Sequence, residues 1–251
     1  MPTSKTGIQA RERLILAVDT SSKDEACHYL KELHNDIGMF KIGLQLFMRY
    51  GPEILKVFQS SGAKIFLDCK YLDIPNTVAR ACEEATAHGV QMFTIHACGG
   101  RPMLQAASQA VSQKAQQLGI AEPTILAVTV LTSISQQVLN DDIGVPGKLE
   151  EHVLKLATQV KESGVKGLVA SPEEVKLLRA QLDHEMVIVT PGVRPEWADA
   201  NDQSRFTTPF QAIQNGSDYL VVGRPITKAA NPKDAARRIV AEIEEASGVS
   251  V

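Results

Sequence analysis

Short apolar runs alternate with longer amphipathic segments along most of the chain, and this alternation limits the folds that the chain can adopt. Eight runs are expected to form strands, at 14–19, 39–43, 64–70, 91–97, 124–131, 167–171, 186–192 and 219–224. Strands that are apolar along their whole length are typical of a parallel sheet that helices cover. Eight such units in 251 residues favour an α/β fold closed into a (β/α)8 TIM barrel.

The segments between these runs carry helical periodicity. Segment 150–164 has apolar residues at i, i+3, i+4 and i+7, which are Val153, Leu156, Ala157 and Val160. Segments 171–174 and 231–234 read Ser-Pro-Glu-Glu and Asn-Pro-Lys-Asp, a capping residue followed by a proline. Because proline is favoured in the first turn of a helix, both segments are predicted to begin helices.

The chain is expected to form a single domain over residues 1–251, with the barrel at about 13–246 after a short polar tail. An open doubly wound sheet is the alternative. That fold often has a glycine-rich turn after an early strand, and the sequence "LILAVDTSSKDEA" has no glycine there. Two long connections, at roughly 132–148 and 193–209, are candidate covers for a substrate.

Composition narrows the class of protein. The formal net charge of −3 gives no reason to expect binding to nucleic acid or to an anionic membrane. The four cysteines show no CxxC spacing and are predicted to be reduced thiols. Neither a signal-peptide pattern nor an apolar run of membrane-spanning length is found, so we expect a cytoplasmic protein.

Ionisable side chains stand at the ends of the predicted strands, although charges are costly to bury unless they are paired. Asp19 ends the first strand, Lys41 is near the end of the second, and Asp68 and Lys70 end the third. Residues two apart share a face of a strand, so Asp68 and Lys70 are expected to point the same way and Cys69 the opposite way. We expect the two aspartates and two lysines to alternate in a charged chain at the mouth of the barrel, where barrels of this type carry their active sites.

The loops after the seventh and eighth predicted strands are expected to bind phosphate, as they commonly do in this fold. The first loop holds Arg194 and Gln203, and the second holds Gly223 and Arg224. Glycine lets backbone amides approach an anion, and arginine presents a forked donor that matches phosphate oxygens. The sequence therefore predicts that the substrate is a phosphate ester.

The stretch "DCKYLDIPNT", at 68–77, resembles the D-x-K-x-x-D-I-x-N-T signature of the orotidine 5′-phosphate decarboxylase family. The resemblance covers nearly the whole chain, because "LILAVD", "FKIGLQLF", "LTS", "TPGVR" and "VVGRPIT" occur in the family's order. It implies decarboxylation of orotidine 5′-monophosphate to uridine 5′-monophosphate in pyrimidine biosynthesis, with no metal and no organic cofactor. It also implies a homodimer with active sites at the interface.

The resemblance implies roles for the residues that match the family's motifs. Lys70 would donate a proton to the pyrimidine ring carbon, and Asp68 would lie against the departing carboxylate. Asp19 and Lys41 would hold the ribose hydroxyls, with Lys41 also part of the charged chain. Asp73 would reach a ribose hydroxyl in the neighbouring subunit's site. The other implied substrate contacts are Ile74 and Thr77 across the interface, Thr132 and Ser135 at the pyrimidine edge, and Arg194, Gln203, Gly223 and Arg224 at the phosphate. Which of Thr132, Ser133 and Ser135 contacts the pyrimidine stays open.

Two other functions remain possible at this point. One is a magnesium-dependent decarboxylase of keto-sugar phosphates, which shares the D-x-K-x-x-D core but is expected to carry a glutamate ligand where this chain has Lys41. Magnesium prefers oxygen ligands, and a lysine cannot serve as one. The other is a barrel that binds nucleotides without catalysis; such a protein is expected to lack the proton donor, whereas Lys70 is present.

Overall fold

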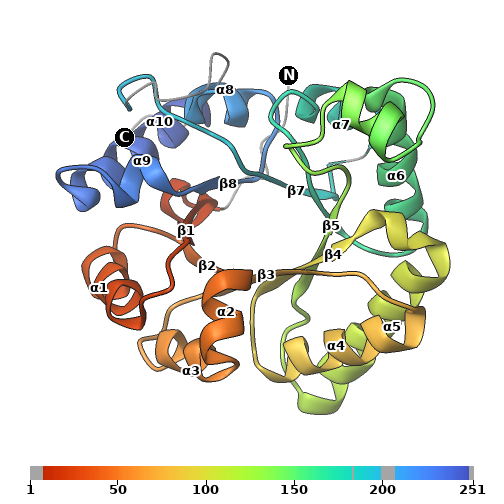
Figure 1. The fold of residues 1–251 in the computed structure, drawn as a ribbon. Coiled ribbons are helices and arrows are strands. Elements are labelled where there is room, and N and C mark those ends of the chain that lie inside the picture. Colours follow the sequence, from red (N-terminus) through yellow and green to blue (C-terminus); the bar gives the residue numbers. More distant parts are fainter. Residues whose placement is uncertain (1–7, 183, 199–206, 249–251) are drawn as a thin grey trace.

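The computed structural model of the chain describes residues 8–182, 184–198 and 207–248. In these ranges, parallel strands pair in sequence order from β1 to β8, and β8 pairs with β1 to close a barrel that helices surround (Figure 1). The strands are β1 (Leu14–Val18), β2 (Met39–Gly43), β3 (Ile65–Tyr71), β4 (Met92–His96), β5 (Thr124–Val128), β6 (Gly167–Val169), β7 (Val187–Thr190) and β8 (Tyr219–Val222). The predicted TIM barrel is confirmed, and the predicted polar tail lies mostly outside the described residues.

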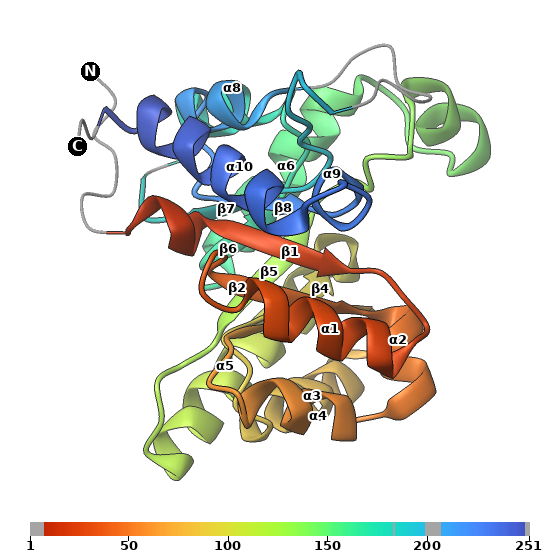
Figure 2. The same cartoon turned by 90° about the vertical axis from the view of Figure 1, so that its left-hand side faces the viewer.

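The helices follow the strands on the outside of the barrel. They are α1 (Lys23–Leu33), α2 (Leu44–Tyr50), α3 (Glu53–Gln59), α4 (Pro75–Ala87), α5 (Gly100–Leu118), α6 (Leu149–Glu162), α7 (Val175–Gln181), α8 (Pro209–Gln214), α9 (Arg224–Thr227) and α10 (Pro232–Ala246), with short turns η1 (Ala10–Arg13), η2 (Ala97–Gly99) and the π-helical η3 (Val138–Asp142). In the view of Figure 2, α10 and α1 lie on either side of β1. None of the described helices is long and apolar enough to cross a membrane.

The buried apolar side chains form two layers. The inner layer fills the barrel and includes Ile15, Met39, Phe66, Leu126 and Val221. The outer, larger layer lies between the strands and the helices. Alternate residues of a strand point into these two layers, which explains why the strands are apolar throughout. The inner layer fills the interior of the barrel with packed side chains, so a ligand can bind only at an end of the barrel and not within it.

The helix predictions are confirmed in two places and wrong in one. All four predicted apolar residues of α6 are buried, and Asn231 caps α10 by accepting a hydrogen bond from the Asp234 backbone N–H, with proline in the first turn. The predicted start at Ser171 is wrong, since α7 begins at Val175. Glu174 accepts a hydrogen bond from the Ser171 backbone N–H at 2.9 Å, which closes a turn before the helix.

Glu174 also supports a prediction about stability. Burial raises the pKa of its carboxyl group to about 7, the Ser171 N–H opposes this, and the charges of Glu173 and Glu150 add to it. Between pH 4.5 and about 7 the folded protein holds a proton that the unfolded chain releases, so the free energy of unfolding falls as pH rises, by on the order of 3 kcal/mol. We expect Glu174→Gln to be more stable than the wild type at pH 8 and to lose that advantage toward pH 4.5.

Urea unfolding at the two pH values measures this difference, and Glu84→Gln is the matched control because Glu84 is exposed and is not one of the groups that shift the pKa of Glu174. If both variants followed the same pH profile, the buried Glu174 carboxyl would not be the source of the dependence.

Candidate active site

A cavity of about 460 Å³ opens at the carboxyl ends of the strands. Its apolar floor includes Phe66, Val128, Val169 and Val221, which belong to β3, β5, β6 and β8. The predicted site residues that line it are Asp19, Lys41, Asp68, Lys70, Thr132, Arg194, Gly223 and Arg224, and Ser133 lines it too. Residues far apart in the sequence are therefore brought to one end of the barrel, as expected for this fold.

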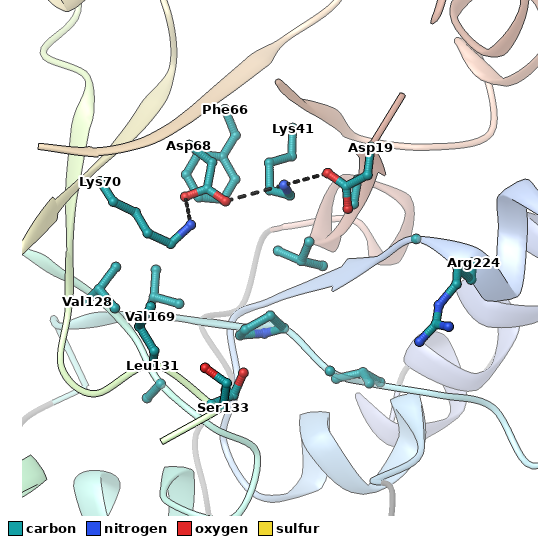
Figure 3. A pocket seen from close by; sticks show the side chains of 18 of the residues that line it. Asp19, Lys41, Phe66, Asp68, Lys70, Val128, Leu131, Ser133, Val169 and Arg224 are labelled. Carbon is teal, nitrogen blue, oxygen red and sulfur yellow. Dashed lines mark hydrogen bonds and ion pairs between the residues drawn. The ribbon is translucent and has the colours of Figure 1, made fainter. Parts of the chain in front are cut away.

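The charged chain at one wall of the cavity follows the predicted order (Figure 3). Lys41 Nζ donates to Asp19 Oδ1 at 3.1 Å and lies 3.3 Å from Asp68 Oδ2. Lys70 Nζ donates to Asp68 Oδ1 at 2.8 Å. Asp68 thus lies between the two ammonium groups, and each of its oxygens contacts one of them. The inner members are largely shielded, with side-chain exposures of 11% for Lys41 and 12% for Asp68, whereas Asp19 is 66% exposed.

The backbone of β3 is irregular where it carries these groups. Lys70 has a φ of 51°, the only positive φ at a non-glycine residue in the described part of the chain. The pairing of β3 with β4 shifts between Leu67 and Tyr71, as at a β-bulge. Residues with such backbone conformations are uncommon, and bulges often re-aim side chains beside active sites. A local distortion of the backbone therefore directs the Lys70 side chain at Asp68. The prediction that the two side chains point the same way had assumed a regular strand.

Thr94 on β4 holds this distortion in place. Its Oγ1 accepts a hydrogen bond from the Lys70 backbone N–H at 2.8 Å and donates one to Asp68 Oδ1 at 3.0 Å. Thr94 falls within the predicted strand at 91–97, but the sequence gave no reason to assign it a role. Its position across from Asp68 continues the regular register in which Leu67 pairs with Phe93, but its contact with the Lys70 N–H depends on the shift that pairs Tyr71 with Ile95. The sequence pattern does not reveal this shift.

Asp68 stays ionised despite its burial. Burial raises the pKa of its carboxyl group, but the charges of Lys41 and Lys70, with hydrogen bonds from Lys70 and Thr94, outweigh burial and lower the pKa below its ordinary value. Burial raises the pKa of the neighbouring Cys69 thiol to about 11, with a further contribution from the Asp68 charge. The side chain of Cys69 packs against the outer apolar layer, in agreement with an inert thiol.

Comparison with known proteins assigns the family. The model of the orotidine 5′-phosphate decarboxylase / HUMPS family matches residues 12–239. The chain belongs to this family. The orotidine 5′-phosphate decarboxylase of Syntrophomonas wolfei is 49% identical over 239 residues, which cover 95% of this chain and 100% of that relative. The orotidine 5′-phosphate decarboxylase of Heliobacterium modesticaldum is 45% identical, with 95% and 98% covered.

A solved structure supports the same assignment. The crystal structure of orotidine 5′-phosphate decarboxylase from Lactobacillus acidophilus superposes with a TM-score of 0.82 at 36% identity, over 92% of this chain and 98% of that chain. The resemblance of the motif at 68–77 to the decarboxylase family is thus confirmed at the level of the whole chain.

Some site residues predicted from the family resemblance do not line the cavity of this chain. Asp73, Ile74 and Thr77 are exposed, and Asp73 Oδ1 accepts a hydrogen bond from the Ile74 N–H at 2.7 Å. Ser135 Oγ accepts one from the Val138 N–H at 3.2 Å, next to η3. Gln203 lies outside the described residues. Among the candidates for the pyrimidine contact, the cavity therefore favours Thr132 and Ser133 over Ser135.

Arg224 lies across the cavity from Lys70, as Figure 3 shows. It begins α9, directly after Gly223 at the end of β8. Arg194 also lines this part of the molecule, and its backbone N–H donates to the Thr207 carbonyl at 3.0 Å, which joins the two stems of the loop after β7. The cavity thus has an arginine-bearing end and a lysine–aspartate end, with apolar residues between them.

Proposed function

We propose that this chain catalyses the decarboxylation of orotidine 5′-monophosphate to uridine 5′-monophosphate, and that the charged chain at β1–β3 performs the chemistry. The observation that carries the proposal is the pairing of Asp68 with Lys70 in a cavity whose other end presents Arg194 and Arg224. A phosphorylated nucleotide has a complementary arrangement, with an anionic phosphate at one end and the reacting carboxylate at the other.

The phosphate is placed at Arg194, Arg224 and the backbone near Gly223, with Gln203 as a further ligand. Arginine offers paired donors to phosphate oxygens, and Gly223 has no side chain to block the approach. Asp19 and Lys41 are placed at the ribose hydroxyls, and Thr132 or Ser133 at the pyrimidine edge. The binding energy of the phosphate, which is remote from the reacting carbon, can then orient the ring above the charged chain.

In the reaction, the bond between the ring carbon and the carboxylate breaks, and its electron pair stays on the ring carbon. The Lys70 ammonium stabilises this negative charge and then donates a proton to the carbon. Carbon dioxide leaves as a neutral molecule, and Lys70 regains its proton from water. Because Asp68 and Thr94 fix Lys70 before the substrate binds, the cation needs little rearrangement as the charge develops.

We further infer that a second copy of the chain completes the site. Four large apolar side chains near the cavity end of the barrel are strongly exposed: Leu44 (51%), Met48 (77%), Leu72 (52%) and Ile74 (67%). They follow β2 and β3 on the same side as the cavity. Exposed apolar residues that gather in this way are typical of an interface. Asp73, Ile74 and Thr77 would then enter the neighbouring subunit's site, which explains why they are exposed here.

An ultraviolet assay with orotidine 5′-monophosphate, with and without a chelator, tests the proposed reaction. We expect loss of the substrate's absorbance at the same rate in both conditions, because a lysine and an aspartate supply the charge stabilisation. The name of the matching family also includes HUMPS, so family membership alone does not fix the substrate. A requirement for magnesium, or turnover of a keto-sugar phosphate in place of the nucleotide, would favour the magnesium-dependent alternative.

A further inference from the structure

A second cavity, of about 470 Å³, lies beside the active-site cavity and next to α9 and α10. The two cavities share Arg194, Arg224 and Pro225, so they meet at the end where the substrate phosphate is placed. The volume lies within the range of small-molecule sites, roughly 300–1,000 Å³. The proposed reaction uses only the shared residues, and the rest of the second cavity has no part in it.

The charge of the second cavity favours an anion. Its walls carry four cationic side chains and one carboxylate: Arg194, Arg224, Lys228, Arg238 and Asp234. Arg224 begins α9 and Lys228 is its C-cap, so the two are four residues apart and lie on the same side of this short helix. A ligand held by Arg224 can therefore be reached by a second cation further from the active site.

Arg238 is held in position by aromatic stacking. Its guanidinium carbon lies 4.0 Å from the centre of the Trp197 ring. The ring is itself fixed, because Trp197 Nε1 donates to Glu242 Oε1 at 3.0 Å. A guanidinium stacked on an aromatic ring keeps its charge and its hydrogen-bond donors, and it loses less conformational freedom when an anion binds.

We propose that this second cavity binds the distal phosphates of a pyrimidine nucleoside 5′-diphosphate or 5′-triphosphate whose first phosphate occupies the site at Arg194 and Arg224. The proposal rests on the proposed function, because the active-site cavity must hold the base, the ribose and the first phosphate. Lys228 and Arg238 contact the added phosphates. Such a nucleotide competes with the substrate, so the reaction slows when more highly phosphorylated pyrimidine nucleotides accumulate.

The test compares uridine 5′-monophosphate, 5′-diphosphate and 5′-triphosphate as inhibitors of the full chain, in buffer with a chelator. We expect competitive inhibition by all three, with an inhibition constant about tenfold lower for the triphosphate than for the monophosphate, which corresponds to about 1.4 kcal/mol. The gain should shrink as salt is raised, because exposed charges are screened.

Three variants identify which residues make the triphosphate bind more tightly than the monophosphate. Lys228→Ala and Arg238→Gln should each reduce the ratio between the monophosphate and triphosphate constants to about twofold, and Lys228→Ala should leave the monophosphate constant unchanged. Lys176→Ala is the matched control, because Lys176 is an exposed lysine on α7 that does not line the cavity.

The possible outcomes separate the two proposals. If the triphosphate binds no more tightly than the monophosphate, or if its gain survives both cavity variants, the second subsite is overturned and the proposed function stands. If the monophosphate itself does not compete with the substrate, the placement of the nucleotide in the active-site cavity is wrong, and the subsite falls with it.

Discussion

Lys70→Ala is expected to lower the rate of decarboxylation by at least about 10⁴-fold while binding of uridine 5′-monophosphate remains measurable. General acid catalysis typically contributes 10²–10⁴-fold, and loss of one preorganised electrostatic group costs about 10²–10³-fold. Both effects depend on the Lys70 ammonium, which Asp68 holds at 2.8 Å. The phosphate and ribose contacts belong to other residues, so most of the binding energy of the product should remain. Single-turnover kinetics and equilibrium binding on the same preparation measure the two quantities.

Lys64→Ala is the matched control for this loss. Lys64 immediately precedes β3, pairs with Glu12 at 3.0 Å and lies at the end of the strand opposite to the cavity. We expect wild-type turnover from it, so any general effect of removing a lysine next to β3 would be visible. Substantial turnover by Lys70→Ala would remove Lys70 from its role as proton donor. A loss that appeared equally in Lys64→Ala would point to folding as the cause.

The barrel could be predicted from the sequence because its main determinant is local. An apolar strand followed by an amphipathic helix is visible in each unit, and repeated units of this kind favour a closed parallel sheet. The positions at which the strands end were predicted less accurately. The fifth strand was predicted to reach residue 131, yet β5 ends at Val128, although Val130 is still buried. Burial continues beyond the last ladder hydrogen bond, so an apolar run overestimates the length of a strand.

The residues of the charged chain were predicted correctly, but the backbone geometry that brings them together was not. Strand alternation implied that Asp68 and Lys70 share a face, and their side chains do meet. However, Lys70 has a positive φ and β3 shifts register against β4. This geometry depends on Thr94, which bonds both residues from the neighbouring strand. A pattern within one strand cannot reveal a distortion that a second strand stabilises.

The exposed segment after β3 marks the other limit of the prediction. Asp73 and Ile74 match the family motif, and the dimer that we propose places their partners in another molecule. In a single chain the Asp73 carboxylate accepts only the Ile74 N–H as a hydrogen bond in the described ranges. A residue that acts across an interface has no local signal of burial or pairing, so only the motif could have identified it.

Mixing two inactive variants is expected to restore activity if the site is shared between subunits. Lys70→Ala lacks the proton donor, and Asp73→Asn lacks the carboxylate that we place in the partner's site, so each homodimer should be nearly inactive. In a two-fold symmetric dimer of one subunit of each kind, one site has both substitutions and the other has neither. Random exchange of equal amounts makes half of the dimers mixed, so we expect about a quarter of wild-type activity.

The control is a mixture of Lys70→Ala with Asp68→Asn, because these two residues contact each other within one chain. Every site in that mixture carries one of the two substitutions, so no activity should return. Subunit exchange is verified independently with differently tagged chains. If exchange occurs and the Lys70→Ala and Asp73→Asn mixture stays inactive, Asp73 does not act across the interface. Activity in both mixtures would instead indicate contamination or an arrangement of the charged chain different from the one that places Asp68 beside Lys70.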